Sequence, residues 1–328
     1  MRTTFTCSSF AIAGFMAVLL VASCDLQAQN QIVSAGYSIP EPPAFAAGQV
    51  VTLFVRGLKV PDAAANGLPL PTTLAGITVR VRSGISGYPE QLPIFSVRTF
   101  DFCAGRIGTS CPLTHVTVQI PTEPTCVPTG QIPNECTIGP AAVIMLNVQL
   151  NGVSGEDFPV VVNSAPHILN ACDTIFGIGG ICTGIVTHGD GLLIKGNNPA
   201  RPGETIVIYA VGLGTTAAVK AGEPSPSQST KYELNLPLIV SYRLDLPAAS
   251  PAPPVVWSPV THWVNPAYIG LVPGYVGLNQ INVAVPSDIP QNLSSCGGEW
   301  GINTRIAIGA GGFGPTDGQT SVDICVQR

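Results

Sequence analysis

Few side chains of this chain can do acid–base or metal chemistry, and they are spread widely along it. There are four histidines: His115, His167, His188 and His262. Only in His188-Gly189-Asp190 does a histidine stand next to a carboxylate, a pattern that could supply metal ligands or half of a hydrolase dyad. Asp190-Gly191 is equally a turn signal. No serine lies in the Gly-x-Ser-x-Gly setting of a hydrolase nucleophile, since Ser86 and Ser154 each miss it by one position. We therefore expect His188 to lie in a polar turn.

The glycine-rich stretch 309–314 formally matches the dinucleotide fingerprint Gly-x-Gly-x-x-Gly. That fingerprint must lead from a strand into a helix, with an acidic residue about 20 positions further on. Here Pro315 follows at once, and the chain ends at Arg328, so we expect a hairpin. Calcium loops of the Asp-x-Asp-x-Asp type are absent. The sequence predicts no catalytic residues, no cofactor and no metal site, although a weak calcium site built from carbonyl groups stays open.

Cysteines give the strongest chemical signal, and that signal is structural. Apart from Cys7 and Cys24 there are eight, and no Cys-x-x-Cys pair occurs, which argues against redox and zinc-ribbon sites. Eight cysteines allow 105 pairings, so the connectivity is an inference from sequence neighbours. We expect these disulfides: Cys103–Cys111, Cys126–Cys136, Cys172–Cys182 and Cys296–Cys325.

Aromatic residues gather in one proline-rich insertion, at 244–268. Its prolines stiffen it toward extended conformations, and a stiff segment loses little entropy on binding. Trp257, His262, Trp263 and Tyr268 are therefore candidate binding residues. The alternative is that 255–257 forms an ordinary strand and Trp263 caps the end of its own domain.

The first 28 residues read as a signal peptide, with a basic start and an apolar core at 10–22. Cleavage after Ala28 competes with a lipobox that would lipidate Cys24, and we favour ordinary secretion because no polar tether follows that cysteine. No later apolar run reaches membrane-spanning length. Charged residues are 10% of the chain and the net charge is −5, so there is no basic footprint for nucleic acid. We expect a secreted or outer-surface protein.

The elements that would position these residues are short strands, and they occur twice. A glycine turn, an apolar run and Gly-Leu make up residues 47–58, and again residues 202–213. A second pair of similar runs stands at 116–121 and 281–286. We expect an all-β protein of two tandem immunoglobulin-like β-sandwiches, 29–165 and 166–328, that abut at a short connection. The alternating residues Val51, Leu53 and Val55 should point inward, matched by Ile206, Ile208 and Ala210.

Three motifs carry a resemblance: P-G-x-x-x-x-I-Y-A-x-G-L-G at 202–214, Y-I-G-L-V-P-G-Y-V-G-L-N-Q-I-N-V-A-V-P at 268–286, and L-P-L-P-T-T-L-A-G-I-T-V-R-V at 68–81. The chain resembles a family of secreted domains, without an assigned activity, that forms the C-terminal region of large exported proteins of Solibacter-type acidobacteria. Each half is also similar to IPT/TIG-like immunoglobulin domains. The cysteine-framed insertions at 103–111 and 126–136 and the segment 244–267 depart from that pattern. The resemblance implies the fold and leaves the activity open.

These patterns favour a non-enzymatic, exported structural, adhesive or protein-interaction module, since a β-sandwich commonly displays binding loops. The expected partners are envelope or extracellular proteins, or surface glycans. One alternative is a carbohydrate-binding or accessory module that uses the aromatic insertion 244–268. A third is a hydrolase whose site assembles from distant residues.

Overall fold

The computed structural model describes residues 30–37, 40–41, 44–82, 90–100, 113–121, 142–162, 165–173, 183–213, 219–227, 230–231, 237–245, 255–258, 262–298, 301–308 and 320–328. Within these ranges the chain is all-β, with strands and turns and no helix, which confirms the predicted all-β class. None of the described segments is therefore a helix with the length and apolarity needed to span a bilayer. The signal-peptide prediction for 1–28 and Cys24 lie outside the described residues.

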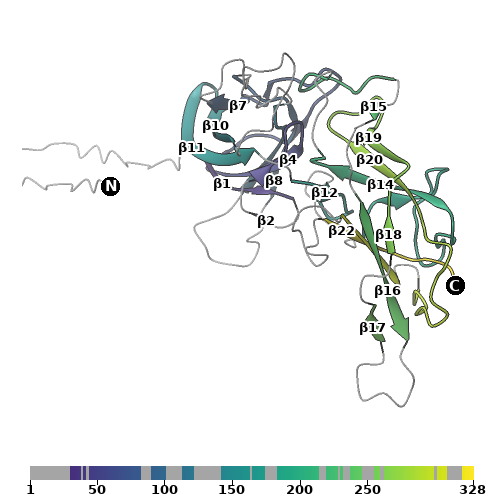
Figure 1. The fold of residues 1–328 in the computed structure, drawn as a ribbon. Helices are drawn as coiled ribbons and strands as arrows, with labels where there is room; N and C mark the ends of the chain where they lie inside the picture. The colour runs from purple at the N-terminus through teal and green to yellow at the C-terminus, as the bar shows by residue number, and fades with distance from the viewer. Residues whose placement is uncertain are drawn as a thin grey trace, which may run out of the picture.

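The first sheet pair consists of β1–β11 (Figure 1). Its sheets have the strand orders β2-β1-β4-β9-β8-β5 and β3-β11-β10-β7-β6. The strands are β1 (Gln31–Gly36), β2 (Pro40–Glu41), β3 (Ala44–Phe45), β4 (Val50–Arg56), β5 (Ala63–Ala64), β6 (Thr73–Leu74), β7 (Ile77–Arg82), β8 (Ile94–Phe100), β9 (Leu113–Gln119), β10 (Ala142–Leu150) and β11 (Val153–Val162).

The second sheet pair consists of β12–β22, with the orders β12-β14-β20-β19-β15 and β17-β16-β21-β22. In addition, β13 pairs with β14, and β18 pairs with β16. The strands are β12 (His167–Ile168), β13 (Val186–Thr187), β14 (Thr205–Val211), β15 (Thr230–Lys231), β16 (Leu238–Asp245), β17 (Val255–Trp257), β18 (His262–Val264), β19 (Tyr268–Leu271), β20 (Asn279–Ala284), β21 (Thr304–Ile308) and β22 (Ser321–Ile324).

Each sheet pair encloses its own hydrophobic cluster, as a β-sandwich does. The six residues predicted to point inward, Val51, Leu53, Val55, Ile206, Ile208 and Ala210, are all fully buried, the first three in one cluster and the others in the second. They recur at every second position because successive side chains of a strand point to opposite faces. Leu169 and Val211 lie past the predicted boundary near 163–166 yet pack in the first cluster, so the second half of the chain helps to close the first core.

Central strands of the two sheet pairs match in register. Val50 of β4 lies opposite Gln119 of β9, and Thr205 of β14 lies opposite Ala284 of β20. These are equivalent positions of the repeated runs, since residue 50 corresponds to 205 and residue 119 to 284 in the two sequence alignments. The outer neighbours correspond as well: β1 lies beside β4 and β8 beside β9, while β12 and β13 lie beside β14 and β19 beside β20.

An Asn-Gly turn closes one long hairpin, and one apolar run with the composition of a strand does not form a strand. Asn151 and Gly152 both have positive φ, at 49° and 84°, and join β10 to β11 in the two-residue turn that an Asn-Gly sequence favours. The apolar run at 192–195 (Leu-Leu-Ile-Lys) predicts a strand, and this prediction is wrong: the segment makes only isolated bridges, Thr187 to Leu193 and Lys195 to Asn198. Leu192 and Leu193 are exposed and only Ile194 packs in the second hydrophobic cluster, so the segment lacks the alternating buried face of a strand.

The two sheet pairs meet in a polar, buried junction. The N–H of Leu70 donates to the carbonyl of Gly222 (2.8 Å), and the N–H of Gly222 donates to Oε1 of Gln119 (2.6 Å). Nε2 of Gln119 donates in turn to the carbonyl of Gly48 (3.0 Å). Because Gln119 is buried, its amide is committed to these bonds, and they fix one sheet pair against the other.

Glycines let the backbones approach at the same junction. A Cβ added to Gly277 would stand 2.7 Å from the carbonyl oxygen of Gly48, and one added to Gly212 would stand 2.8 Å from the Gln49 side chain. Both glycines also have positive φ. They belong to the motifs Y-V-G-L and Y-A-V-G-L, so these motifs serve the packing of one sheet pair on the other.

Candidate binding face

Trp257 and Trp263 lie on the same outer side of one sheet of the second pair. Trp257 pairs with Arg243 of β16, and Trp263 pairs with Ile239 of the same strand. Residues 239 and 243 share a face, because side chains alternate along a strand. The core residues Leu238, Val240 and Tyr242 point to the other side. Trp257 is 36% exposed and Trp263 is 62% exposed, so neither is a core anchor.

A polar row lies on that same face. Ser241 pairs with Arg305 of β21, and Arg305 pairs with Asp323 of β22. Arg305 donates from Nε and Nη2 to the two carboxylate oxygens of Asp323, at 2.7 and 2.8 Å. Its guanidinium lies over the Trp257 ring, 4.5 Å from the centroid. We call this surface, made of Trp257, Trp263, Ser241, Arg305 and Asp323, the tryptophan face.

Electrostatics hold the polar row in place. The bond to the Asp323 carboxylate is the main reason that the pKa of Arg305 is raised, partly opposed by burial. A bidentate pair of this kind is planar and directional. The pair is about one-quarter exposed on each side, so it is fixed by packing and still reaches solvent. The face therefore presents rigid hydrogen-bonding groups beside two indole rings.

The other two candidate binding residues do not join this face. His262 pairs with Val240, a core-facing position, and its ring lies 5.8 Å from that of Tyr242 in a T-shaped contact. Tyr268 lies on β19 in the opposite sheet, and its hydroxyl donates to the carbonyl of Leu271 (3.2 Å). The sequence analysis treated the four aromatic residues as one candidate site because they are close in the sequence. In the structure they lie on three different surfaces.

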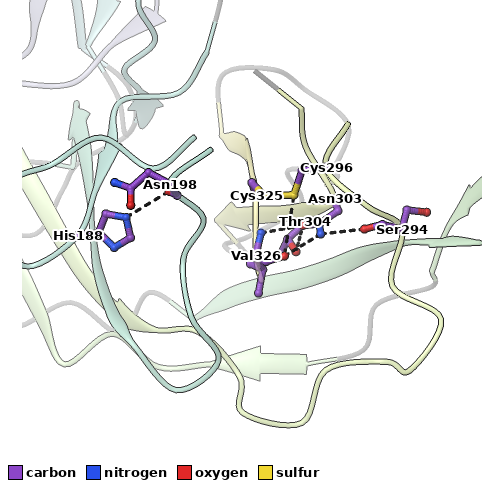
Figure 2. The surroundings of a disulfide bond; sticks show 8 residues. All are labelled: His188, Asn198, Ser294, Cys296, Asn303, Thr304, Cys325 and Val326. Carbon is purple, nitrogen blue, oxygen red and sulfur yellow. Dashed lines mark hydrogen bonds between the residues drawn. A yellow bond between two sulfur atoms is a disulfide. The ribbon is translucent and has the colours of Figure 1, made fainter. Parts of the chain in front are cut away.

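His188 lies in the polar turn that its sequence predicted. The N–H of Gly191 donates to the His188 carbonyl, and the N–H of Leu192 donates to Oδ1 of Asp190. Nδ1 of the His188 ring, however, lies 2.5 Å from Oε1 of Glu204, the residue directly before β14. Its Nε2 lies 3.3 Å from the carbonyl of Asn198 (Figure 2). Burial acts to raise the pKa of Glu204, but the Arg201 N–H and the His188 ring outweigh it and lower that pKa.

A second histidine–carboxylate pair, missed by the sequence reasoning, is buried at the junction. Nε2 of His167 lies 2.8 Å from Oδ2 of Asp173, which also accepts from the N–H of Asn170. The His167 ring stacks on Tyr37 of the first sheet pair, with centroids 3.7 Å apart. The two partners are six positions apart in the sequence, and no short motif marks them.

The partners of both histidines are oxygen atoms of carboxylates or of the backbone. Nε2 of His167 contacts Asp173, and the two ring nitrogens of His188 contact Glu204 and the Asn198 carbonyl. Among the residues that the structure describes, no three His, Cys, Asp or Glu side chains gather as metal ligands would. Ser154 lies on β11, where its hydroxyl accepts from Nε2 of Gln149 (2.7 Å). Ser86 and the 309–314 stretch lie outside the described residues.

The predicted disulfide between Cys296 and Cys325 is present, with Cα atoms 5.7 Å apart. Beside it the buried Asn303 side chain donates to the carbonyls of Ser294 (3.0 Å) and Val326 (2.9 Å), and accepts from the Val326 N–H (2.8 Å) (Figure 2). Cys172 is also disulfide-bonded, and its expected partner Cys182 lies outside the described residues. So do the remaining predicted cysteines: Cys103, Cys111, Cys126 and Cys136.

No protein-family model matches the chain, and no curated protein matches it significantly.

Proposed function

We propose that the chain is a non-enzymatic, exported interaction module that binds its partner through the tryptophan face. The observation that carries this proposal is the exposure of Trp257 and Trp263 on one side of a packed sheet. Tryptophan is over-represented among the residues that dominate binding energies. Strands also hold such side chains more firmly than loops do, which lowers the entropy lost on binding.

Placement in the molecule supports the same proposal. β16 and β17 extend away from the first sheet pair (Figure 1), so the tryptophan face lies apart from the junction. The junction itself commits Gln119, Gly222 and Gly277 to internal packing. The first sheet pair would then orient the second, and the second would carry the ligand.

We further propose that the architecture is a tandem of immunoglobulin-like domains, 29–165 and 166–328, of the secreted family that the motifs resemble. The strand orders β1-β4-β9-β8 and β13-β14-β20-β19 support it, as do β11-β10-β7 and β22-β21-β16. Export through the signal peptide 1–28, to the outer surface or the medium, is supported by the Cys296–Cys325 disulfide, because such bonds persist in oxidising compartments.

Two measurements on the secreted chain test the proposal. First, the wild type and Trp263→Ala are immobilised and exposed to the protein and glycan fractions of the native cell surface. We expect specific retention by the wild type and its loss in the variant, with an unchanged melting temperature, because Trp263 is largely exposed. Second, a broad ester and glycoside panel should show no turnover. Equal retention by both proteins, or turnover of any substrate, would overturn the proposal.

A further inference from the structure

The tryptophan face combines two indole rings, spaced along the strand direction, with a polar row that runs across the strands. Trp263 and Trp257 oppose Ile239 and Arg243, four residues apart on β16, which places them about 13 Å apart along the strand. The row Ser241, Arg305 and Asp323 crosses the sheet between those two positions. The polar row therefore begins at Ser241, level with the gap between the two tryptophans, and runs away from them across β21 and β22.

Opposite charges on the tryptophan face largely compensate one another. The two carboxylate oxygens of Asp323 neutralise Arg305. Arg243, opposite Trp257, acts on Asp245, and Asp245 also pairs with Arg328 at 2.7 Å. The three arginines Arg243, Arg305 and Arg328 thus share the two carboxylates of Asp245 and Asp323, which leaves a surplus of one positive charge. A cationic ligand would find no carboxylate without an arginine, and an anionic ligand would find only that single surplus charge. The arrangement is best matched by an uncharged ligand.

The polar row suits a ligand that is rich in hydroxyl groups. The bonds between Arg305 and Asp323 occupy two of the five guanidinium donors and leave acceptor capacity on the carboxylate. Adjacent hydroxyls of a sugar can accept from the guanidinium and donate to the carboxylate. Because the pair is already fixed over Trp257, little side-chain entropy is lost on binding.

The largely exposed indole ring of Trp263 suits the apolar side of the same ligand. One face of a pyranose ring presents C–H groups with small positive partial charges, and the face of an indole is negative. Protein partners, in contrast, bury about 800 Å² per side around a contiguous apolar centre. Here the residues between the tryptophans are polar, and the neighbouring apolar side chains Ile239 and Ala307 are already buried.

We infer that the tryptophan face binds a linear, uncharged polysaccharide chain, with a sugar ring stacked on Trp263 and hydroxyls bonded to Arg305 and Asp323, while Trp257 holds the Arg305 guanidinium in position. This inference rests on the proposed function, because it names the class of ligand that the proposed binding face would take.

Calorimetric titration of the full secreted chain tests it, with cellohexaose, xylohexaose, mannohexaose and chitohexaose as neutral probes and hexagalacturonate as the acidic comparison. We expect binding of at least one neutral probe, weakened about tenfold or more by Trp263→Ala and by Trp257→Ala. Tyr275→Ala is the matched control, since Tyr275 is 59% exposed but lies in the turn between β19 and β20. Asp323→Asn leaves Arg305 uncompensated and should shift preference toward hexagalacturonate.

Three results overturn the inference: no neutral probe binds, the acidic probe binds best to the wild type, or Trp263→Ala binds as well as Tyr275→Ala. If no glycan binds but Trp263→Ala still loses a protein from the cell-surface fraction, the glycan assignment fails and the proposed function stands. If neither glycan nor protein binding depends on Trp263, both fail.

Discussion

At the scale of single residues, Gly277 and Gly274 allow a matched test of the junction. Both lie in the turn between β19 and β20 and have positive φ, at 66° and 80°. A Cβ on Gly274 would meet nothing within 4 Å, whereas one on Gly277 would overlap the backbone oxygen of Gly48. Gly274→Ala should therefore lose about 1–2 kcal/mol of unfolding free energy from backbone strain alone.

Gly277→Ala should lose a further 1–3 kcal/mol or so, because the extra methyl group overpacks the junction. Urea unfolding of the two variants measures the difference. Equal losses would mean that the close approach at Gly48 does not limit packing there.

His115 should make the protein sensitive to mild acid. Its ring packs between Phe54 and Phe100, is 2% exposed, and burial lowers its pKa from 6.5 to about 4. The unfolded chain takes up this proton near pH 6.5, while the folded chain does so only near pH 4. The unfolded state therefore binds more protons in that window, and stability present above pH 6.5 is lost as the pH falls, by about 3 kcal/mol in all.

Urea unfolding at several pH values between 7 and 4 checks this, with His115→Leu as the comparison. The variant should show a pH slope that is shallower by up to one proton. Parallel curves for the two proteins would exclude His115 as the source.

At the scale of elements, the Cys296–Cys325 disulfide should stabilise the last strand against its sheet. It joins positions 29 apart in the sequence, and closing a loop of that length contributes about 3–4 kcal/mol in the chain-entropy model. The double variant Cys296→Ser/Cys325→Ser should lose stability of that order by calorimetry. Since Asn303 holds the same segment through three hydrogen bonds to Ser294 and Val326, β22 should remain paired in the variant at moderate temperature. Loss of the β22 amide protection would contradict this.

Strand prediction from the sequence succeeded where alternation and a buried face coincide. β4 and β14 lie within the repeated runs at 47–58 and 202–213, and β17 spans the strand considered at 255–257. β18 and β19 were not predicted, since His262–Val264 and Tyr268–Leu271 are too short to show a period. They become strands because β16 and β20 offer ladder partners, a tertiary effect that a local window cannot contain.

At the scale of the whole molecule, Gln119 should couple the unfolding of the two sheet pairs. Its amide bonds both Gly48 in the first pair and Gly222 in the second, away from water. Gln119→Ala leaves a buried N–H and a buried carbonyl without this partner, which costs about 1–3 kcal/mol for each. We expect one calorimetric transition for the wild type and two for the variant.

Gln149→Ala is the control for that experiment. Gln149 bonds only Ser154 on the exposed side of β10 in the described part of the chain, so this variant should keep a single transition close to that of the wild type. Two transitions already in the wild type would contradict the coupling.

The candidate face was only half predictable from the sequence. Trp257 and Trp263 were singled out by their place in a proline-rich insertion, but Arg305 and Asp323 lie 42 and 60 residues beyond Trp263 (305 − 263 and 323 − 263) and carry no motif. Only the register of β16, β21 and β22 brings them beside the indoles. The junction escaped the sequence for the same reason, because Gln119 and Gly222 are 103 residues apart.

The Cys296–Cys325 bond also sets how far the chain can be stretched. An extended residue spans about 3.5 Å. The covalent link therefore prevents roughly 100 Å of chain from being extended when the two ends are pulled apart. Tension applied to the two ends bypasses residues 297–324, which include β21 and β22, and runs through the sulfur atoms. Half of the sheet that carries Arg305 and Asp323 is thus sheltered from load, and a protein tethered at a surface would keep this part of its ligand contacts while other strands yield.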